Sequence, residues 1–235
     1  GHIDPITLND VYNFRAIDEN TKLYGITGYP LTVTDSPKIH NKGYRDHGMN
    51  AVYIPFKAKK IEESLAFAEE MEIRGFSVTI PHKEAILPDL QQVSAIVGEI
   101  GACNTAVNRG DSWIGFNTDA DGLQKALCDF LGVKNLARKK VAIIGAGGAA
   151  RAAAYVVKQL RGKACIFNRT VSKAKSIAEH FGFKYANLSA ESEDILEQYS
   201  DLIIQTTSIG MGVPAGTMYD EEKQVDPISF YTFHG

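Results

Sequence analysis

A glycine-rich turn between an apolar strand and a helix is the feature that most constrains the fold of this chain. Residues 141–144 are a β-branched and apolar run, and residues 149–160 have helix-forming composition. The turn fits the GxGxxG/A pattern: the first glycine makes a tight turn, the second admits a pyrophosphate, and the third position, here Ala150, must be small. This unit predicts a Rossmann-type nucleotide site at a helix N-terminus. The alternative is a glycine-rich turn without a ligand. The expected cofactor contacts are Gly145, Ala146, Gly147, Gly148 and Ala149.

The residues after the next predicted strand favour NADP over NAD. Enzymes that use NAD usually place an acidic residue there, about 20 residues after the glycine turn, to bind the ribose 2′-hydroxyl. This chain instead has Asn168, Arg169 and Thr170, followed by Lys173. Arginine can bind a 2′-phosphate with two parallel hydrogen bonds, whereas a carboxylate would repel it. These four residues are therefore expected to bind NADP, the alternative being that the two cations are only solvated at a helix start.

Strands and helices alternate along both halves of the 235-residue chain. In the first half, β-rich runs at residues 23–28, 51–56 and 76–80 are separated by helical stretches at residues 38–45 and 61–71. A hairpin turn at residues 108–111 joins runs 102–107 and 113–116, and a helix over residues 119–131 is expected to end near Gly132. In the second half, strands are expected at residues 164–167 and 201–206, with a helix at residues 171–181. The alternation predicts an α/β fold: a mostly parallel substrate domain, then a doubly wound NADP domain.

Composition excludes several classes of protein. Hydrophobic residues make up 44% of the chain and charged residues 23%, which is ordinary globular usage. A net charge of −3 argues against nucleic acid or an anionic membrane as the main partner. Cys103, Cys128 and Cys165 contain no CxxC pair, so we expect buried apolar residues, no metal site and a reducing compartment such as the cytoplasm. No apolar run reaches the roughly 18 residues of a membrane span.

Two segments of the first half carry the residue types that an alcohol dehydrogenation needs. Residues 75–83 run from a strand into a turn and place Thr79 and Lys83 at a carboxyl strand end, where open α/β sheets bind ligands. Residues 115–119 end in Asp119 at the start of a helix. A lysine beside a carboxylate can take the hydroxyl proton as hydride leaves. The simpler alternatives are a surface lysine and an aspartate that caps the helix.

Six ordered motifs carry a resemblance to a known family. They are SVTIPHK (77–83), IGACNTAV (100–107), GFNTDADG (115–122), GAGGAAR (145–151), NRTVSKA (168–174) and QTTSIGM (205–211). At these residues the chain resembles the shikimate dehydrogenase family. Residues 8–25 also resemble the junction of bifunctional proteins that join a 3-dehydroquinate dehydratase to a shikimate dehydrogenase. The resemblance implies three segments: a tag remnant and linker from a dehydratase-like domain (1–20), a substrate-binding catalytic domain (21–122) and an NADP-binding Rossmann domain (123–235).

The resemblance also implies roles for individual residues. Lys83 resembles the family's catalytic lysine, which exchanges a proton with the substrate's 3-hydroxyl, and Asp119 its paired carboxylate. Asn104 and Thr79 resemble ligands of the substrate hydroxyls. In the last motif, Thr206 and Met211 are expected to contact the cofactor, with Met211 at the nicotinamide end. The implied reaction is the reduction of 3-dehydroshikimate to shikimate by NADPH, in the cytoplasm, or in the plastid of a plant-type parent.

The chain departs from the family pattern at two places. The family's His-Ser-x-Ser-Pro stretch, whose serines hold the substrate carboxylate, is here Val33-Thr34-Asp35-Ser36-Pro37. Thr34 and Ser36 keep the hydroxyls, and Asp35 is expected to point outward. The family's C-terminal return segment has no counterpart in residues 224–235, so low activity is expected. Three alternatives remain: a quinate or quinate/shikimate dehydrogenase, a non-catalytic NADP-binding relative, and a dinucleotide module of a non-enzymatic interaction protein.

Overall fold

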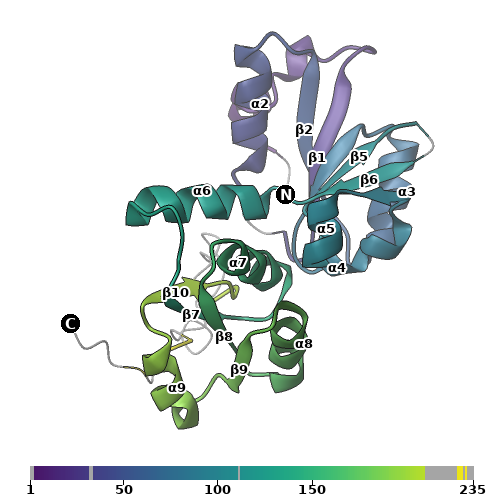
Figure 1. Cartoon of the computed structure of the whole chain (residues 1–235). Helices are drawn as coiled ribbons and strands as arrows, with labels where there is room; N and C mark the ends of the chain where they lie inside the picture. Colours follow the sequence, from purple (N-terminus) through teal and green to yellow (C-terminus); the bar gives the residue numbers. More distant parts are fainter. Residues whose placement is uncertain (1–2, 32–33, 111, 210–226, 230, 232–235) are drawn as a thin grey trace. The chain divides into compact units, whose positions relative to one another are not determined.

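The chain divides into two compact units. The computed structural model describes residues 3–31, 34–110, 112–209, 227–229 and 231 (Figure 1). Unit 1 consists of Gly1–Gly98 and Cys103–Asn117, and unit 2 of Glu99–Ala102 and Thr118–Gly235. Each unit contains its own β-sheet with helices packed against it.

The sheet of unit 1 is mixed and has the strand order β2-β1-β3-β5-β6-β4. Its strands are β1 (Lys22–Gly28), β2 (Ala51–Lys57), β3 (Gly75–Val78), β4 (Gln92–Val93), β5 (Thr105–Asn108) and β6 (Trp113–Phe116). β1 pairs in parallel with β2 and β3, and β4 pairs in parallel with β6. β5 runs antiparallel to both β3 and β6, which confirms the hairpin predicted around residues 108–111.

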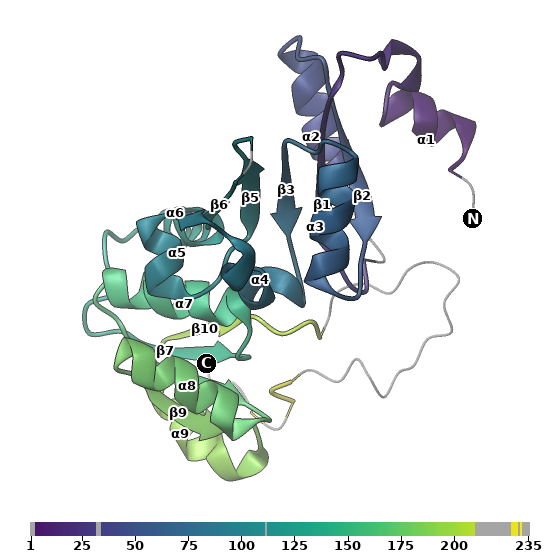
Figure 2. The same cartoon turned by 90° about the vertical axis from the view of Figure 1, so that its right-hand side faces the viewer.

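The helices of unit 1 cover both faces of its sheet. Unit 1 contains α1 (Pro5–Asp10), α2 (Ser36–Asp46), α3 (Ile61–Glu70), α4 (His82–Ala85) and all but the last two residues of α5 (Ala95–Ile100), with short 3₁₀ helices at Phe14–Ala16 and Leu87–Asp89. Figure 2 shows α3 in front of the β1–β3 part of the sheet and α2 behind it. Alternate residues of β1, β2 and β3 therefore face the α2 side or the α3 side.

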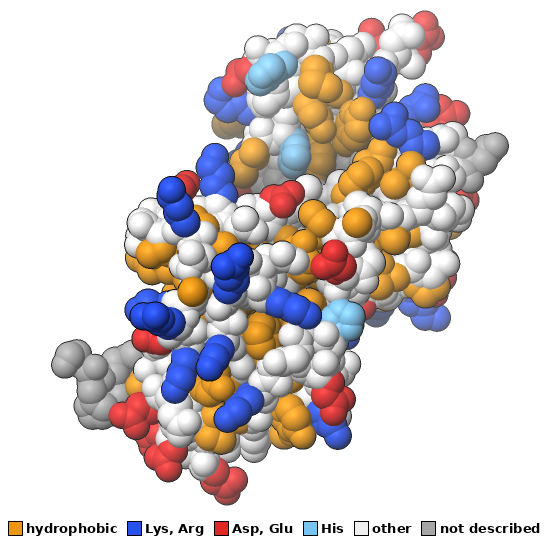
Figure 3. Space-filling view, in the orientation of Figure 1, with side chains coloured by type: hydrophobic (Ala, Val, Ile, Leu, Met, Phe, Trp, Pro, Cys, Tyr) orange, Lys and Arg blue, Asp and Glu red, His pale blue; other side chains and the backbone are white. Residues whose placement is uncertain are grey.

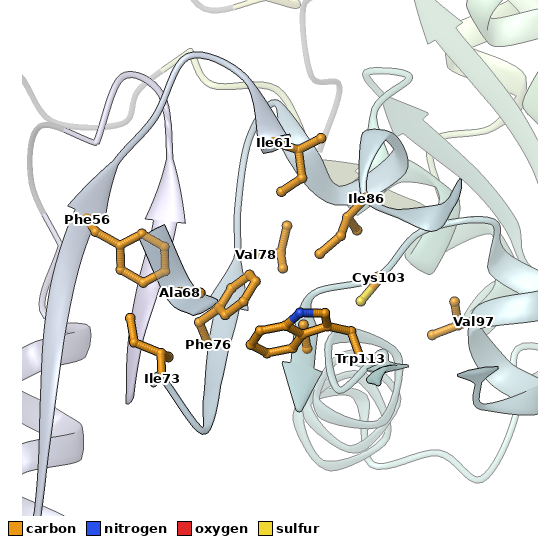
Figure 4. Close-up of a cluster of buried hydrophobic side chains, with 11 residues drawn as sticks. Phe56, Ile61, Ala68, Ile73, Phe76, Val78, Ile86, Val97, Cys103 and Trp113 are labelled. Carbon is orange, nitrogen blue, oxygen red and sulfur yellow. The ribbon is translucent and has the colours of Figure 1, made fainter. Parts of the chain in front are cut away.

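The main core of unit 1 lies on the α3 face (Figure 4). Phe76 and Val78 of β3 point into this core, and the Phe76 ring packs edge-on against Trp113 with ring centroids 5.0 Å apart. Burying each such side chain stabilises the fold by roughly 1.5–3 kcal/mol. Ser77, between them, faces the α2 side, where Tyr53 is buried. The period-2 alternation of β3 thus separates an apolar face from a face that carries hydroxyl groups.

Unit 2 is built on a four-stranded parallel sheet of order β10-β7-β8-β9. The strands are β7 (Lys140–Ile144), β8 (Lys163–Asn168), β9 (Lys184–Asn187) and β10 (Leu202–Gln205). The helices are α6 (Asp119–Leu131), α7 (Gly148–Gln159), α8 (Val171–Phe181) and α9 (Glu193–Gln198), with a 3₁₀ helix at Ala190–Ser192. In chain order this is the 3-2-1-4 arrangement of a Rossmann half, so the predicted α/β class with a Rossmann-type unit is confirmed.

Several expectations can be compared directly with these elements. Helix α6 ends at Gly132, whose φ of +63° is the left-handed conformation that favours glycine after a helix. Cys103 and Cys165 are buried as expected, whereas Cys128 is half-buried. No helix of the described residues is long and apolar enough to cross a membrane. The functional division at residues 122 and 123 falls inside α6, a helix of unit 2, and stays a prediction.

Candidate active site

The glycine-rich turn lies between β7 and α7, at the carboxyl end of the sheet of unit 2. Gly145 has a φ of +114°, and a β-carbon there would lie 2.5 Å from Thr206 Oγ1. Thr206 donates from both its N–H (2.9 Å) and its Oγ1 (2.7 Å) to the carbonyl of Ile144. Ala150, at the third position of the motif, is fully buried. The fold therefore requires glycine at position 145 and a small residue at position 150, as the dinucleotide-binding pattern does.

The N-terminus of α7 is open toward the turn. Gly147 is the N-cap residue in an extended conformation, and a β-carbon there would meet no atom within 4 Å. Gly147 has no side chain to cap this end of α7, and no acidic residue lies in the first turn of the helix. The first N–H groups of a helix have no partner within the helix, and the helix dipole favours an anion there. The residues present thus fit the pyrophosphate of a dinucleotide.

The next loop of unit 2 fits a further phosphate. Asn168 ends β8 and donates from Nδ2 to the carbonyl of Thr170 (3.1 Å), which shapes the turn into α8. Arg169 and Lys173 are exposed on this turn and on the first turn of α8, which contains no acidic residue. On the face shown in Figure 3, Lys and Arg side chains gather over unit 2. A positively charged surface favours the approach of a phosphate group.

Thr79 and Lys83 occupy a tightly held turn at the carboxyl end of β3. The N–H of Thr79 donates to Thr27 O (3.0 Å), and its carbonyl accepts from the N–H of His82 (2.9 Å). His82 is buried, with its Nε2 2.9 Å from the carbonyl of Ala58. Lys83 is half-buried in α4, and its carbonyl accepts the N–H of Cys103 at 2.7 Å. The backbone that carries Lys83 is therefore fixed from both sides.

Asn104 lies on the strand connection beside this turn. Its carbonyl accepts the N–H of Val78 (2.7 Å), and its own N–H donates to Phe116 O (3.0 Å). Its Oδ1 accepts from Thr105 Oγ1 at 2.9 Å. These bonds hold Asn104 next to the end of β3, so unit 1 brings Thr79, Lys83 and Asn104 to one sheet edge.

Asp119 is the first residue of α6, and Thr118 is the N-cap residue. Asp119 thus lies in the first turn of α6 and not at its N-cap position. A carboxylate in the first turn is stabilised by the helix dipole. Asp119 belongs to unit 2 and Lys83 to unit 1, so their pairing stays a prediction.

The start of α2 carries the two hydroxyls expected to hold the substrate carboxylate. Thr34 Oγ1 accepts the N–H of Ser36 (3.2 Å) and lies 3.0 Å from Ser36 Oγ. Asp35 points into solvent as expected, because its carboxylate is exposed and forms an ion pair with Lys38 Nζ at 3.2 Å. Val33 and Met211 lie outside the described residues.

Tyr53 and Ser77 were missed by the sequence reasoning. Tyr53 is buried and donates its hydroxyl to Ser77 Oγ over 2.7 Å. The His40 ring stacks on the Tyr53 ring with centroids 4.2 Å apart, and the Asn41 side chain bonds both the N–H and the carbonyl of Tyr53. Burial raises the pKa of the Tyr53 hydroxyl, so it stays a donor. Only Ser77 could have been found from the sequence: it is a hydroxyl residue between the apolar residues of β3 and shares its face of the strand with Thr79, two positions on.

Comparison with known proteins places these features in a family. A profile of the shikimate dehydrogenase substrate-binding domain matches residues 26–106, and a shikimate/quinate 5-dehydrogenase profile matches residues 130–224. A shikimate dehydrogenase (NADP(+)) of Halothermothrix orenii is 36% identical over 220 residues, which are 87% of this chain and 75% of that protein. The chain belongs to the shikimate dehydrogenase family. The recognition made from the six sequence motifs is thereby confirmed.

Two further members of the family are informative. A shikimate dehydrogenase solved in complex with NADP+ superposes with a TM-score of 0.73 at 34% identity, covering 88% of this chain and 74% of that one. A chloroplastic bifunctional 3-dehydroquinate dehydratase/shikimate dehydrogenase of Arabidopsis thaliana is 36% identical over 217 residues, which are 87% of this chain but only 36% of that protein. The shared fold thus occurs both in single-function enzymes and in a fusion.

Proposed function

We propose that this member of the shikimate dehydrogenase family is an NADP-dependent oxidoreductase that interconverts 3-dehydroshikimate and shikimate. The observation that carries the proposal is the sheet edge of unit 1, where Lys83 O is bonded to Cys103 N–H and Asn104 O to Val78 N–H. These bonds hold the backbone from which the Lys83 amine and the Asn104 amide extend, next to Thr79, and this supports the proposal. These side chains suit a small polyhydroxylated ring, because such a ring needs several hydrogen-bonding partners and one proton acceptor.

Lys83 and Asp119 are the proposed catalytic pair. In the oxidation direction, the Lys83 amine accepts the proton of the 3-hydroxyl as the hydride leaves the carbon that carries it. Asp119 orients the substrate and the Lys83 ammonium. Asn104 and Thr79 bind ring hydroxyls, and Thr34 and Ser36 bind the carboxylate. In the reduction direction, Lys83 returns the proton to the carbonyl oxygen, as microscopic reversibility requires.

Unit 2 holds the cofactor in this proposal. NADP supplies the hydride acceptor when it is bound. The open N-terminus of α7, with Gly145, Ala146, Gly147, Gly148 and Ala149, binds the pyrophosphate, since backbone N–H groups and the helix dipole meet there. Asn168, Arg169, Thr170 and Lys173 bind the adenosine 2′-phosphate. Thr206 and Met211 are further proposed cofactor contacts, Met211 for the nicotinamide end.

The biological setting is part of the same proposal. The substrate is a small molecule, and neither nucleic acid nor membrane is a partner. In its parent protein the chain is fused to a dehydratase domain, as in the Arabidopsis relative, and works in the cytoplasm or plastid.

The test compares shikimate with quinate as substrates. Formation of NADPH from NADP+, or of NADH from NAD+, is followed by absorbance with each acid. The proposal expects oxidation of shikimate with NADP+ as the preferred pair. Quinate oxidation without shikimate oxidation would make the chain a quinate dehydrogenase. NADPH binding without any turnover would make it a non-catalytic relative.

A further inference from the structure

A four-residue segment of the chain has no role in the proposed chemistry, although it leads directly to one of the proposed site residues. Glu99–Ala102 clusters with unit 2, although the residues on both sides of it, up to Gly98 and from Cys103, belong to unit 1. The segment begins in the last turn of α5 and leads within two residues to Asn104. Side chains of unit 2 that bond to this segment are therefore only a few residues of backbone away from Asn104, a proposed substrate ligand.

His180 holds the beginning of the segment. It lies near the end of α8, and its Nε2 is 2.6 Å from the carbonyl oxygen of Glu99. The carbonyl can only accept, so Nε2 carries the hydrogen and donates. Glu99 is in the last turn of α5, where carbonyls have no partner within the helix. The His180 ring also packs edge-on against Phe181, a buried residue, with centroids 4.6 Å apart, which fixes its orientation.

A second helix of unit 2 has a side chain beside the middle of the segment. Gly101 has a φ of +69°, and a β-carbon there would lie 3.4 Å from Nη1 of Arg151 on α7. The guanidinium of Arg151 therefore lies against the turn, which needs glycine for its left-handed backbone. Helices α7 and α8, whose N-termini form the proposed nucleotide site, thus each bring a side chain to these four residues: Arg151 beside Gly101 and His180 on Glu99 O.

The two residues that follow the segment are bonded to the elements of the proposed substrate site. Cys103 is fully buried, and its N–H donates to Lys83 O at 2.7 Å. Asn104 follows, with both of its backbone groups bonded to neighbouring strands. A shift of Ala102 would therefore strain the bond between Cys103 N–H and Lys83 O and displace Asn104.

We propose that His180 is a positioning residue: through Glu99–Ala102 it fixes Asn104 and the backbone of Lys83 for the reaction at the substrate. The inference rests on the proposed function, because it gives these residues their roles. Loss of the His180 donor lowers kcat/KM for shikimate by roughly 3- to 10-fold, the size expected for one hydrogen bond. The affinity for NADP is unchanged, because His180 lies two helical turns beyond Lys173 on α8, or about 10 Å along the helix axis.

The kinetic test uses three variants. His180→Leu removes the donor, and His180→Gln keeps an amide nitrogen at a similar distance from the backbone. His47→Leu is the matched control, because exposed His47 also contacts a helix carbonyl, with Nδ1 2.9 Å from Gly43 O, but at the end of its own helix, α2. We expect H180L to lose shikimate efficiency with an unchanged dissociation constant for NADP+, H180Q to recover most of it, and H47L to match the wild type.

A structural readout separates this inference from the proposed function. Hydrogen exchange of the Cys103 backbone amide reports the bond to Lys83 O whether or not the chain turns over shikimate. H180L should raise exchange at Cys103 severalfold and leave the β7 amides unchanged. If H180L does not fold, His180→Ala replaces it, since it adds no exposed apolar side chain.

The outcomes are distinct. Normal Cys103 exchange and normal shikimate kinetics in H180L would overturn the positioning role, as would H180Q and H180L being equally impaired. A wild-type chain without shikimate turnover would overturn the proposed function. In that case, faster Cys103 exchange in H180L would still support the structural anchor, and unchanged exchange would remove it.

Discussion

Thr206 closes the space beside Gly145: a β-carbon on Gly145 would lie 2.5 Å from Thr206 Oγ1. The Thr206 hydroxyl is itself fixed by its bond to Ile144 O at 2.7 Å. By contrast, a β-carbon on Gly147 would meet no atom within 4 Å. The first glycine is therefore needed by the fold, whereas the second has space that a ligand can use.

This difference predicts separate effects for two alanine substitutions. Gly145→Ala should lower the free energy of unfolding by about 1–3 kcal/mol, because it combines a φ of +114° with a steric overlap. Gly147→Ala should leave the unfolding midpoint nearly unchanged and weaken NADP+ binding about tenfold or more. Urea unfolding and calorimetric titration with NADP+ check the pair. A G147A variant that binds NADP+ normally would contradict the pyrophosphate site.

The Arg169 turn predicts the cofactor preference. Arg169→Ala should reduce the affinity for NADP+ by roughly 10- to 100-fold and leave the affinity for NAD+ nearly unchanged, because only NADP+ carries the 2′-phosphate. The measurement is the ratio of the two dissociation constants. Lys175→Ala is the control, since Lys175 pairs with Glu179 further along α8 at 3.6 Å. An unchanged ratio in R169A would place the 2′-phosphate elsewhere.

The hydroxyl of Tyr53 predicts an effect on both stability and substrate binding. Tyr53→Phe keeps the stacked ring and removes only the donor to Ser77 Oγ. We expect a loss of about 1 kcal/mol in the free energy of unfolding and a higher KM for shikimate. Tyr24→Phe, on the same face of the sheet, makes the same chemical change and is the control. Equal effects in the two variants would show that the Tyr53–Ser77 bond has no particular importance.

Tyr44 predicts a loss of stability at high pH. Burial, aided by Tyr24 and Tyr53, raises the pKa of Tyr44 from 10.0 to about 12. Because the unfolded chain ionises this tyrosine first, its contribution to stability is complete below pH 10 and is lost as the pH rises toward 12. Tyr44→Phe should therefore flatten the decline of the urea midpoint in this window. An equally steep decline in Y44F would assign the effect to other groups.

The sequence was enough to predict the structure where a single short motif determines the local backbone. The turn after β7 is an example, because the left-handed Gly145 and the buried Ala150 follow from the pattern alone. β9 was missed because its sequence, Lys184–Asn187 (KYAN), contains no β-branched residue. Asp119 and Thr118 are both good capping residues, and only the backbone shows that Thr118 holds the cap position.

Contacts between distant parts of the chain could not be predicted in the same way. The Tyr53–Ser77 bond joins two strands, and the His180–Glu99 bond joins residues 81 positions apart. Neither pair has a spacing or pattern that sequence periodicity can detect, because each depends on which elements become neighbours in the fold. The roles of Lys83 and Asn104 likewise came from family resemblance, and the structure added the backbone bonds that hold them.

The most direct test of the central claim is the rate of shikimate-dependent NADPH formation by the wild-type chain and its Lys83→Ala variant, with Lys125→Ala on α6 as the control. We predict that K83A loses at least about a hundredfold in kcat, because it lacks the proton acceptor, while binding NADP+ normally. K125A should equal the wild type. Turnover by K83A at the wild-type rate would contradict the account, because the proton would then leave by a route without Lys83.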